Sequence, residues 1–363
     1  MDVQQILLEQ IEKKKTEFKS ESYPMSIGEL TSLYEKKELV INPDFQRLFR
    51  WTDSQKTKLV ESILLGIPIP TIFVFQREDA IWELVDGLQR VSTLLQFMGM
   101  LPDKPRLKLQ STKYLPNLEG VVWESTEEGD VELPQSLKLF IKRAKLNFTI
   151  ILSDTGKNAK FEVFQRLNTG GTQASPQEVR NSLMIMTNKP VYEWLSNISK
   201  NTDFLTTISV SERLVEEQYP MELALRHIAL LRYTYTPKKE LSDFFDDVTE
   251  QILTEEGVDF ISYSDNFNQT FQLLNRVLGE DSFKRFDGDK FKGKFLESAF
   301  EAVSIGIAFN FDSYKFPEDN QIIIDKIKQI HSHPNFVSYT GSGSNARTRI
   351  PNVIPFAKEH FRK

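Results

Sequence analysis

The chain has 363 residues, of which 40% are hydrophobic and 26% are charged, and its net charge is −6. This composition is ordinary for a folded protein, and the length predicts two domains or one domain with a large appendage. The absence of cysteine excludes a disulfide framework, a thiol nucleophile and a cysteine-ligated metal site. The acidic balance argues against general coating of nucleic acid, although it is compatible with a local basic groove. No apolar run approaches the roughly 20 residues of a membrane span, so we expect a cytoplasmic protein without a membrane partner.

The first hundred residues alternate between helical and strand patterns. Residues 2–18 predict an amphipathic helix, residues 26–36 a second helix and residues 39–41 a short strand. A loop rich in arginine and aromatic residues follows at 42–51. Beyond it, apolar spacing and turn signals predict a helix capped by Thr52 or Asp53, a strand at 71–75, its hairpin partner at 81–85, and a helix from Gln89.

A polar turn joins the strand that ends at Val85 to the helix that follows it. Within five residues this turn presents the Asp86 carboxylate, the Gly87 amide, the Gln89 carboxamide and the Arg90 guanidinium. Glycine tolerates the backbone angles of a sharp corner, and the N–H groups of a helix N-terminus beside an arginine favour a bound anion. The alternative interpretation is a capped turn with Arg90 in a surface ion pair, and the residues alone leave both open.

An N-terminal domain is expected to span 1–186, with a helical extension at 1–20 and a β-rich insertion at 102–132. The insertion is predicted from its proline, glycine and acidic residues. The patterns after it predict a helix at 133–143, a strand at 144–152, a helix at 158–167 and a polar glycine loop at 168–172. The sequence Ser-Pro-Gln-Glu at 175–178 has the capping signature of a further helix.

Nearly every later segment shows helical spacing of its apolar residues, which predicts a helical domain at 187–363. The tail departs from this pattern with a small polar loop that ends near Ser344, then Arg347 and Arg349, before a terminal helix at 350–361. An extended backbone would aim both arginines to the same side. Small residues, exposed amides and two aligned cations predict a contact with phosphate oxygens, in DNA or in a nucleotide. A solvated hinge is the alternative.

Four short motifs occur in the order that they have in a known family. They are Phe45-Gln46-Arg47 with Trp51, the segment from Ser62 to Pro70, Asp86-Gly87-Leu88-Gln89-Arg90, and the segment from Phe164 to Gly171. Residues 22–185 thereby resemble the ParB/sulfiredoxin-like domain at the N-terminus of GmrSD-type modification-dependent restriction enzymes. They are also similar to the nucleotide-hydrolysing half of the phosphorothioate-sensing protein SspE. The family signature is Asp-Gly-Gln-Gln-Arg, and Leu88 replaces its first glutamine here. The fold class implied is α+β, ParB-like, followed by an all-helical domain.

The resemblance also implies the residues of a nucleotide site. Catalytic roles are expected for Asp86, Gln89 and Arg90, with Asp86 holding Mg²⁺ or orienting a water molecule. The expected nucleotide-binding residues are Gln46, Arg47, Gly87, Arg166, Asn168, Gly170 and Gly171. No P-loop signature occurs in the sequence, so a nucleoside triphosphate would be bound by other means.

The leading hypothesis is a nucleotide-binding, NTP-hydrolysing component of a bacterial anti-phage defence system that acts on DNA. The alternatives are a DNA-binding or partner-binding module without turnover, and a ParB-like nuclease that uses the same corner. Larger members of the family carry a C-terminal His-Asn-His nuclease, and none of the four histidines here falls in such a motif. A separate nuclease subunit is therefore an expected partner, and the oligomeric state is left open. His331 and His333 have the spacing of a metal-binding pair, but no third ligand is evident near them.

Overall fold

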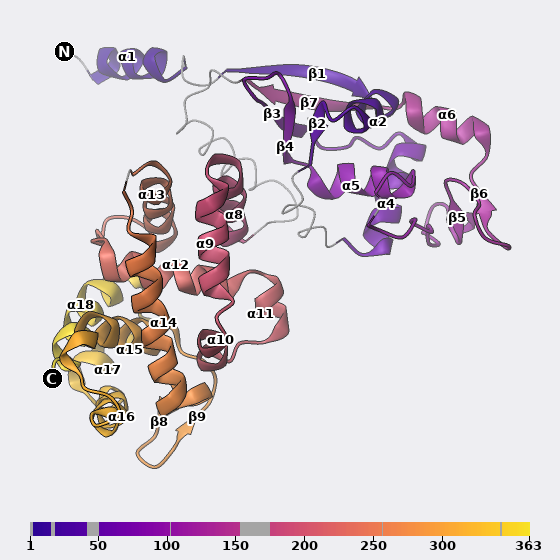
Figure 1. Cartoon of the computed structure of the whole chain (residues 1–363). Helices are drawn as coiled ribbons and strands as arrows, with labels where there is room; N and C mark the ends of the chain where they lie inside the picture. Colours follow the sequence, from indigo (N-terminus) through magenta and orange to yellow (C-terminus); the bar gives the residue numbers. More distant parts are fainter. Residues whose placement is uncertain are drawn as a thin grey trace. The chain divides into compact units, whose positions relative to one another are not determined.

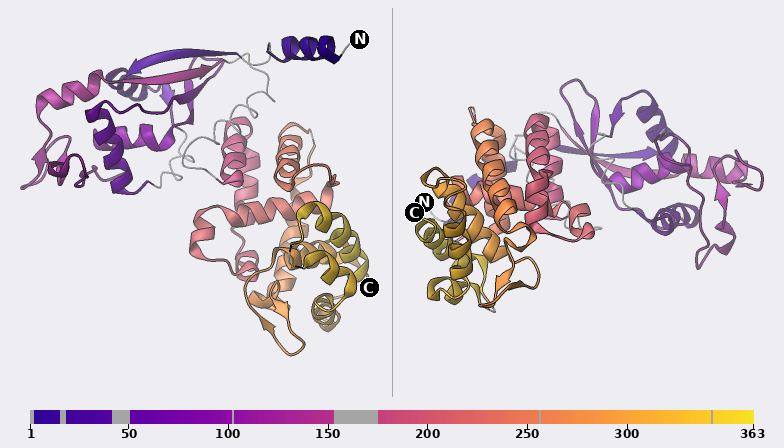
Figure 2. Two further views of the ribbon diagram at one scale, coloured as in Figure 1. Left: turned by 180° about the vertical axis from the view of Figure 1, so that it is seen from behind. Right: turned by 60° about the horizontal axis from the view of Figure 1, so that its bottom comes forward.

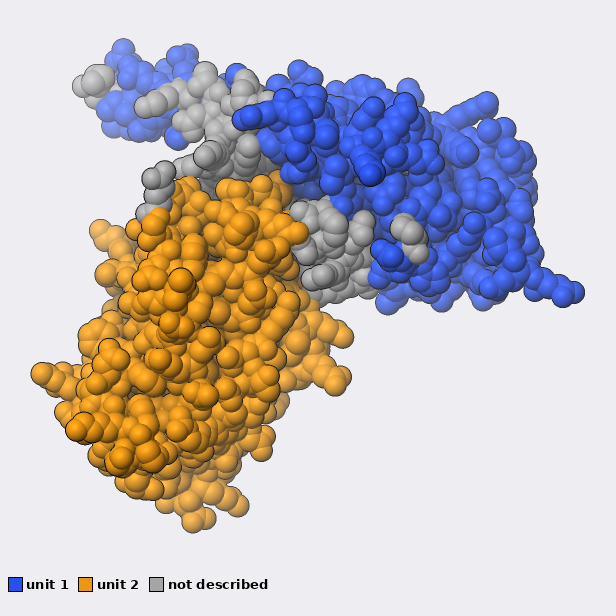
Figure 3. Space-filling view, viewed as in Figure 1, with its two compact units in different colours: residues 1–173 blue, residues 174–363 orange. Residues whose placement is uncertain are grey.

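The computed structural model describes residues 3–15, 19–41, 51–101, 103–152, 175–255, 257–341 and 343–363. Contacts within the chain divide it into two compact units, which comprise residues 1–173 and 174–363 (Figure 3). The first unit is mixed α/β and the second is helical, so the predicted fold class is confirmed.

Unit 1 is built on a five-stranded mixed sheet (Figure 1). Its strands, in spatial order, are β1 (Ser20–Ser26), β7 (Lys145–Ile151), β3 (Ile72–Gln76), β4 (Trp82–Asp86) and β2 (Leu39–Val40). β1 pairs antiparallel with β7 and β3 pairs antiparallel with β4, while β3 with β7 and β4 with β2 are parallel. The predicted β3–β4 hairpin is therefore confirmed. β1 was not predicted, because its residues alternate poorly and only Met25 is fully buried.

Unit 1 contains five described helices, two of which begin at side-chain caps. They are α1 (Val3–Lys15), α2 (Ile27–Glu35), α4 (Asp53–Leu65), α5 (Leu88–Phe97) and α6 (Gln135–Arg143). Thr52 caps α4 in a reciprocal box with Gln55, and Ser26 caps α2 by accepting the N–H of Glu29. Leu59 of α4 and Leu94 of α5 are buried in one hydrophobic core with the sheet. Burial of such a side chain contributes about 1.5–3 kcal/mol, which fixes the helix that follows the polar corner.

The insertion between α5 and α6 contains little regular structure, as predicted. It holds a 3₁₀ turn, η1 (Pro116–Leu118), and two short parallel strands, β5 (Val121–Val122) and β6 (Val131–Glu132). Trp123 is buried against Phe97 of α5, with ring centroids 5.5 Å apart. The insertion is therefore attached to the core of unit 1 and is not a separate domain.

Unit 2 is a set of helices packed around one phenylalanine-rich core (Figure 2). The helices are α8 (Pro176–Thr187), α9 (Lys189–Ser199), α10 (Thr202–Ile208), α11 (Glu212–Glu216), α12 (Tyr219–Arg232), α13 (Leu241–Thr254), α14 (Phe260–Val277), α15 (Glu297–Asn310), α16 (Asn320–Ile330), α17 (Pro334–Thr340) and α18 (Ala346–His360). The 3₁₀ turns are η2 (Gly279–Asp281) and η3 (Phe311–Ser313), and β8 (Arg285–Phe286) pairs with β9 (Phe291–Lys292). Phe204, Phe267 and Phe271 meet at centroid distances of 4.4–5.0 Å. Such aromatic contacts add to the stability gained from area burial alone.

Two features of unit 2 differ from the sequence predictions. The division between units falls before α8, not after it at 186, because Met184 of α8 lies in the core of unit 2 and Arg180 pairs with Asp246. The β8–β9 hairpin interrupts a region expected to be helical, since Gly288 and Gly293 take positive φ angles that favour turns. The capping box at Ser175 and Glu178 is confirmed.

Candidate functional site

The polar corner follows directly from the end of strand β4. Gly87 has φ of 96° and is the N-terminal boundary of α5, where it supplies no side-chain cap. A Cβ atom at this position would lie 3.0 Å from Cγ1 of Ile72 on the neighbouring strand. Both the positive φ and the close approach strongly favour glycine at this corner. The first N–H groups of α5 are consequently left without a capping side chain at Gly87, as in helix N-termini that bind anions.

The Arg90 side chain forms hydrogen bonds to three other residues of the corner. Its guanidinium donates to Oδ2 of Asp86 at 2.7 Å, to the carbonyl of Thr71 at 3.1 Å and to the carbonyl of Pro70. Only 13% of the side chain is exposed. These bonds fix the end of β4 and the start of β3 to the first turn of α5. Arg90 is therefore a positioning residue in this arrangement, and its guanidinium is already engaged by protein oxygens.

Gln89 joins the corner to the segment that precedes α4. Its Oε1 accepts the N–H of Trp51 at 3.1 Å. The Trp51 indole Nε1 is buried with no hydrogen-bond partner among the described residues. A buried donor left unpaired costs free energy, which marks this neighbourhood as polar and incompletely satisfied.

Asp86 is the accessible acid of the corner. Its side chain is 35% exposed, and only its Oδ2 has a hydrogen-bond partner among the residues that the structure describes. Oδ1 can therefore accept from a water molecule or bind a metal ion. Within the same described residues, no group of three or more His, Asp or Glu side chains could hold a metal ion. A single free carboxylate oxygen fits the way proteins hold Mg²⁺ jointly with substrate phosphates, since Mg²⁺ keeps several waters.

Six of the predicted binding residues lie outside the described residues: Gln46, Arg47, Arg166, Asn168, Gly170 and Gly171. The predicted helix at 158–167 lies outside them as well. The structure therefore brings together Asp86, Gly87, Gln89 and Arg90. It also adds participants that the sequence did not single out, the carbonyls of Pro70 and Thr71. The proline-rich end of the Ser62-to-Pro70 motif was the signal that could have found them.

The arginines of the tail are not on an extended strand, so that prediction is wrong. Arg347 and Arg349 lie in the first turn of α18, because Asn345 caps this helix through the N–H of Thr348. Arg347 pairs with Glu240 and remains 47% exposed. Arg349 binds both carboxylate oxygens of Glu301, at 2.7 and 2.9 Å, and is only 14% exposed. The Ser344 hydroxyl donates to the carbonyl of Tyr339.

Arg349 belongs to a buried ionic network. Glu301 is fully buried and also accepts from Arg226, which in turn binds Glu222 and Glu297. Burial alone would raise the pKa of Glu297, but the Arg226 guanidinium reverses this and lowers the pKa below its usual value. The network connects α12, α15 and α18, so it serves the packing of unit 2.

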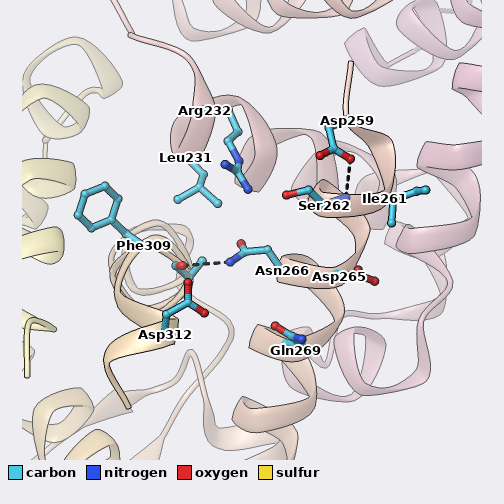
Figure 4. A pocket seen from close by; sticks show the side chains of 11 residues that line it. Leu231, Arg232, Asp259, Ile261, Ser262, Asp265, Asn266, Gln269, Phe309 and Asp312 are labelled. Carbon is cyan, nitrogen blue, oxygen red and sulfur yellow. Dashed lines mark hydrogen bonds between the residues drawn. The ribbon is translucent and has the colours of Figure 1, made fainter. Parts of the chain in front are cut away.

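A hollow on the surface of unit 2 lies between α12, α14 and α15 (Figure 4). Its volume is about 620 Å³, and Figure 4 shows Arg232 directed toward Ser262 and Asn266. Asp259 accepts the N–H of Ser262 at 2.9 Å, and Asn266 donates to the carbonyl of Ala308 at 3.1 Å. Most lining side chains are exposed, and none of the residues predicted from sequence lines this hollow.

The histidine pair lies at the boundary between α16 and α17. His331 packs edge-on against Phe336, and burial together with the charge of Arg285 lowers its pKa to about 4. Nδ1 of His333 accepts the N–H of Asn335 and caps α17. Both rings thus have structural contacts in unit 2.

The fold and the corner together define an α/β domain with a glycine-made, carboxylate-bearing turn at a helix N-terminus. Residues 27–185 match the family model described as "GmrSD restriction endonuclease, N-terminal domain". The resemblance of this region to that family, which the ordered motifs predicted, is confirmed. No curated protein matches the chain.

Among solved structures, a Pnob8-like ParB-N domain is similar at 12% identity, with 95% of this chain and 99% of that chain covered and a TM-score of 0.25. Among the described residues, no helix is long and apolar enough to cross a membrane.

Proposed function

We propose that this protein is a nucleotide-binding, NTP-hydrolysing component of a restriction-type defence system that acts on DNA. The family assignment of residues 27–185 supports the restriction-type role. The single observation that carries the nucleotide site is the corner itself. There Gly87 leaves the start of α5 without a side-chain cap, beside a carboxylate with one unpartnered oxygen among the described residues. Phosphate groups favour an uncapped helix N-terminus, and hydrolysis needs a group that holds a metal ion or orients water.

Each residue of the corner has a role in this proposal. Asp86 orients the attacking water or holds Mg²⁺, and Arg90 keeps the Asp86 carboxylate in place. Gly87 lets the backbone approach the phosphates, and Gln89 holds the Trp51 segment beside the site. The cationic contacts to the phosphates are assigned to Arg47 and Arg166, because the Arg90 guanidinium is engaged by protein oxygens.

Magnesium would bind through Asp86 and the nucleotide phosphates. When bound, the ion would supply charge neutralisation for the phosphoryl group that is transferred. Because Mg²⁺ commonly uses one or two carboxylates in such sites, the single free oxygen of Asp86 is sufficient for this role.

A comparison of wild type with Asp86→Asn tests the proposal. Asparagine keeps an oxygen that can accept from Arg90, so the corner should hold its shape. We expect ATP, GTP, CTP or UTP with Mg²⁺ to raise the melting temperature of both proteins. We expect NTP hydrolysis by the variant to fall by roughly 10²-fold or more, since an acid that orients water acts mainly in the transition state.

If nucleotides stabilise Asp86→Asn and the variant hydrolyses them at the wild-type rate, Asp86 has only a structural role in the turn. If none of the four nucleotides stabilises the wild-type chain, the proposed nucleotide site is wrong.

The second candidate function, DNA or partner binding without turnover, is favoured by one observation. The only arginine of the described corner is engaged internally. Nucleotide-independent DNA binding with no phosphate release would support that function.

A further inference from the structure

The hollow between α12, α14 and α15 of unit 2 is lined mainly by polar side chains (Figure 4). Its volume of about 620 Å³ lies within the roughly 300–1,000 Å³ that small-molecule sites occupy. Most such sites are lined by apolar groups. The charged and amide side chains on the wall of this hollow are Arg232, Asp259, Asp265, Asn266, Gln269 and Asp312. Such a lining selects a ligand that is itself polar and charged.

Arg232, at the C-terminal end of α12, presents a guanidinium that an aromatic ring holds in place. The guanidinium carbon lies 4.9 Å from the centre of the Tyr263 ring. The side chain is exposed, and it forms no hydrogen bond or ion pair with the residues that the structure describes. Because contact with a ring face leaves the N–H groups at the edge of the guanidinium available, Arg232 can bind a carboxylate in the hollow.

Asp312 of η3 lines the same hollow on the side away from Arg232. Figure 4 shows Arg232 above the centre of the hollow and Asp312 below it. The two side chains do not form an ion pair, and Asp312 has no hydrogen-bond partner among the described residues. Opposite charges that share a hollow without pairing leave room between them for a ligand that carries both charges.

An unpaired acceptor lies between these two charges. Asn266 donates its amide N–H to the carbonyl of Ala308 at 3.1 Å, and its buried Oδ1 has no hydrogen-bond partner. Figure 4 places Asn266 between Arg232 and Asp312. A buried acceptor without a partner costs free energy, and a donor on a ligand would satisfy it.

The balance of charge on the wall narrows the class of ligand. Three carboxylates line the hollow with one guanidinium, so a phosphate group would be repelled and a nucleotide is disfavoured. Among the described residues, no group of His, Asp or Glu side chains could hold a metal ion. An organic ligand with cationic groups alone would leave the Arg232 guanidinium unpaired. A ligand with one anionic and one cationic group satisfies both sides of the hollow.

We propose that this hollow binds a small zwitterion of the amino-acid class, either a free amino acid or a short peptide, with an apolar side chain. Its carboxylate accepts hydrogen bonds from Arg232, and its ammonium group donates to Asp312. Leu231 and the Phe309 ring, which is 57% exposed, supply the apolar contact. Both charges of the ligand are then paired through charge-assisted hydrogen bonds. The site shares no residue with the corner of unit 1.

Ligand-observed NMR titration of the full chain tests the proposal without any nucleotide, so its result does not depend on the function proposed above. L-leucine and leucyl-leucine are the probes, and they distinguish a free amino acid from a peptide. We expect at least one of them to bind with a dissociation constant of roughly 0.1–1 mM. The C-terminal amide of that probe lacks the carboxylate, and its N-acetyl derivative lacks the ammonium group. Each should bind at least roughly tenfold more weakly than the parent probe.

Variants on the two sides of the hollow assign each contact, with circular dichroism as the check on folding. Arg232→Ala should weaken binding of the zwitterion at least roughly tenfold and leave that of the C-terminal amide unchanged. Asp312→Asn should weaken binding of the zwitterion similarly and leave that of the N-acetyl derivative unchanged. Arg276→Ala is the matched control, because Arg276 is exposed in the last turn of α14 and does not line the hollow.

Three results would overturn the proposal. The first is the absence of binding by both probes at millimolar concentration. The second is an amide or N-acetyl derivative that binds as tightly as its parent. The third is wild-type affinity for the zwitterion in a folded Arg232→Ala or Asp312→Asn variant.

Discussion

Two arginine–carboxylate clusters, one in each unit, differ in how far their charged groups are buried. In unit 1, Arg90 holds Asp86, whose side chain is 35% exposed and keeps one oxygen without a partner among the described residues. In unit 2, Arg226 and Arg349 converge on Glu301, which is fully buried and binds both arginines. The first cluster retains an exposed oxygen that can act on a ligand, whereas in the second the charged groups pair with one another in the interior of unit 2.

The difference shows how to separate functional charges from structural ones. A buried ion pair is costly to desolvate, so proteins pair its charges with one another internally. A site for a ligand must instead leave hydrogen-bonding capacity at an exposed atom. By this criterion the Asp86 corner is a candidate site and the Glu301 network is part of the core of unit 2.

The largest expected effect is on the buried network. Glu301→Ala would leave Arg226 and Arg349 without their shared carboxylate and should lower the free energy of unfolding by about 3–5 kcal/mol. Urea denaturation followed by circular dichroism measures this. Glu318→Ala, at an exposed site, is the control and should change stability by less than about 0.5 kcal/mol. A small effect at 301 would mean that the network contributes little to the packing of unit 2.

The next effect concerns Arg90. Arg90→Ala removes the hydrogen bonds to Asp86, Thr71 and Pro70, and it should lower the free energy of unfolding by about 1.5–3 kcal/mol. Because Asp86 is then no longer held in place, nucleotides should also stop raising the melting temperature. Arg77→Ala is the matched control, because Arg77 is 43% exposed and its ion pairs should contribute less than about 1 kcal/mol. Equal destabilisation by the two variants would contradict the positioning role.

Two glycines of unit 1 with positive φ allow the cost of a side chain at the corner to be compared with its cost at an ordinary helix end. Gly87→Ala should cost about 2–3 kcal/mol, because it adds a close contact with Ile72 to the strain of φ at 96°. Gly66→Ala, with φ of 70° and no atom within 4 Å of the added Cβ, should cost only about 1–2 kcal/mol. Thermal melts of both variants measure the difference. An identical cost would show that the corner tolerates a side chain.

The smallest effect is expected in the tail. Arg347→Ala should lower stability by less than about 1 kcal/mol, since its pair with Glu240 is exposed. If Arg347 contacts a DNA phosphate, the slope of log affinity against log salt should become shallower by about 0.9. DNA binding titrated at several salt concentrations measures this, and an unchanged slope would exclude the contact.

Much of the local structure could be read from the sequence. The β3–β4 hairpin, the turn at Gly87, the N-terminal cap of α4, the capping box of α8 and the helical character of unit 2 all follow from short-range patterns. These features depend on residues within a few positions of each other, where side-chain period, caps and glycine angles act directly. The family of residues 27–185 was also evident from ordered motifs.

Tertiary structure decided which groups meet across long separations. Strand β1 exists because β7 pairs with it along its whole length, although most of its residues are exposed and only Met25 is fully buried. Arg349 lies against Glu301, 48 residues away along the chain, so a cation that the sequence offered for phosphate is held in the core of unit 2. Arg90 is likewise occupied by carbonyls about 20 residues distant. Sequence determines which chemical groups are available, but their remaining hydrogen-bonding capacity depends on packing partners that only the folded chain brings together.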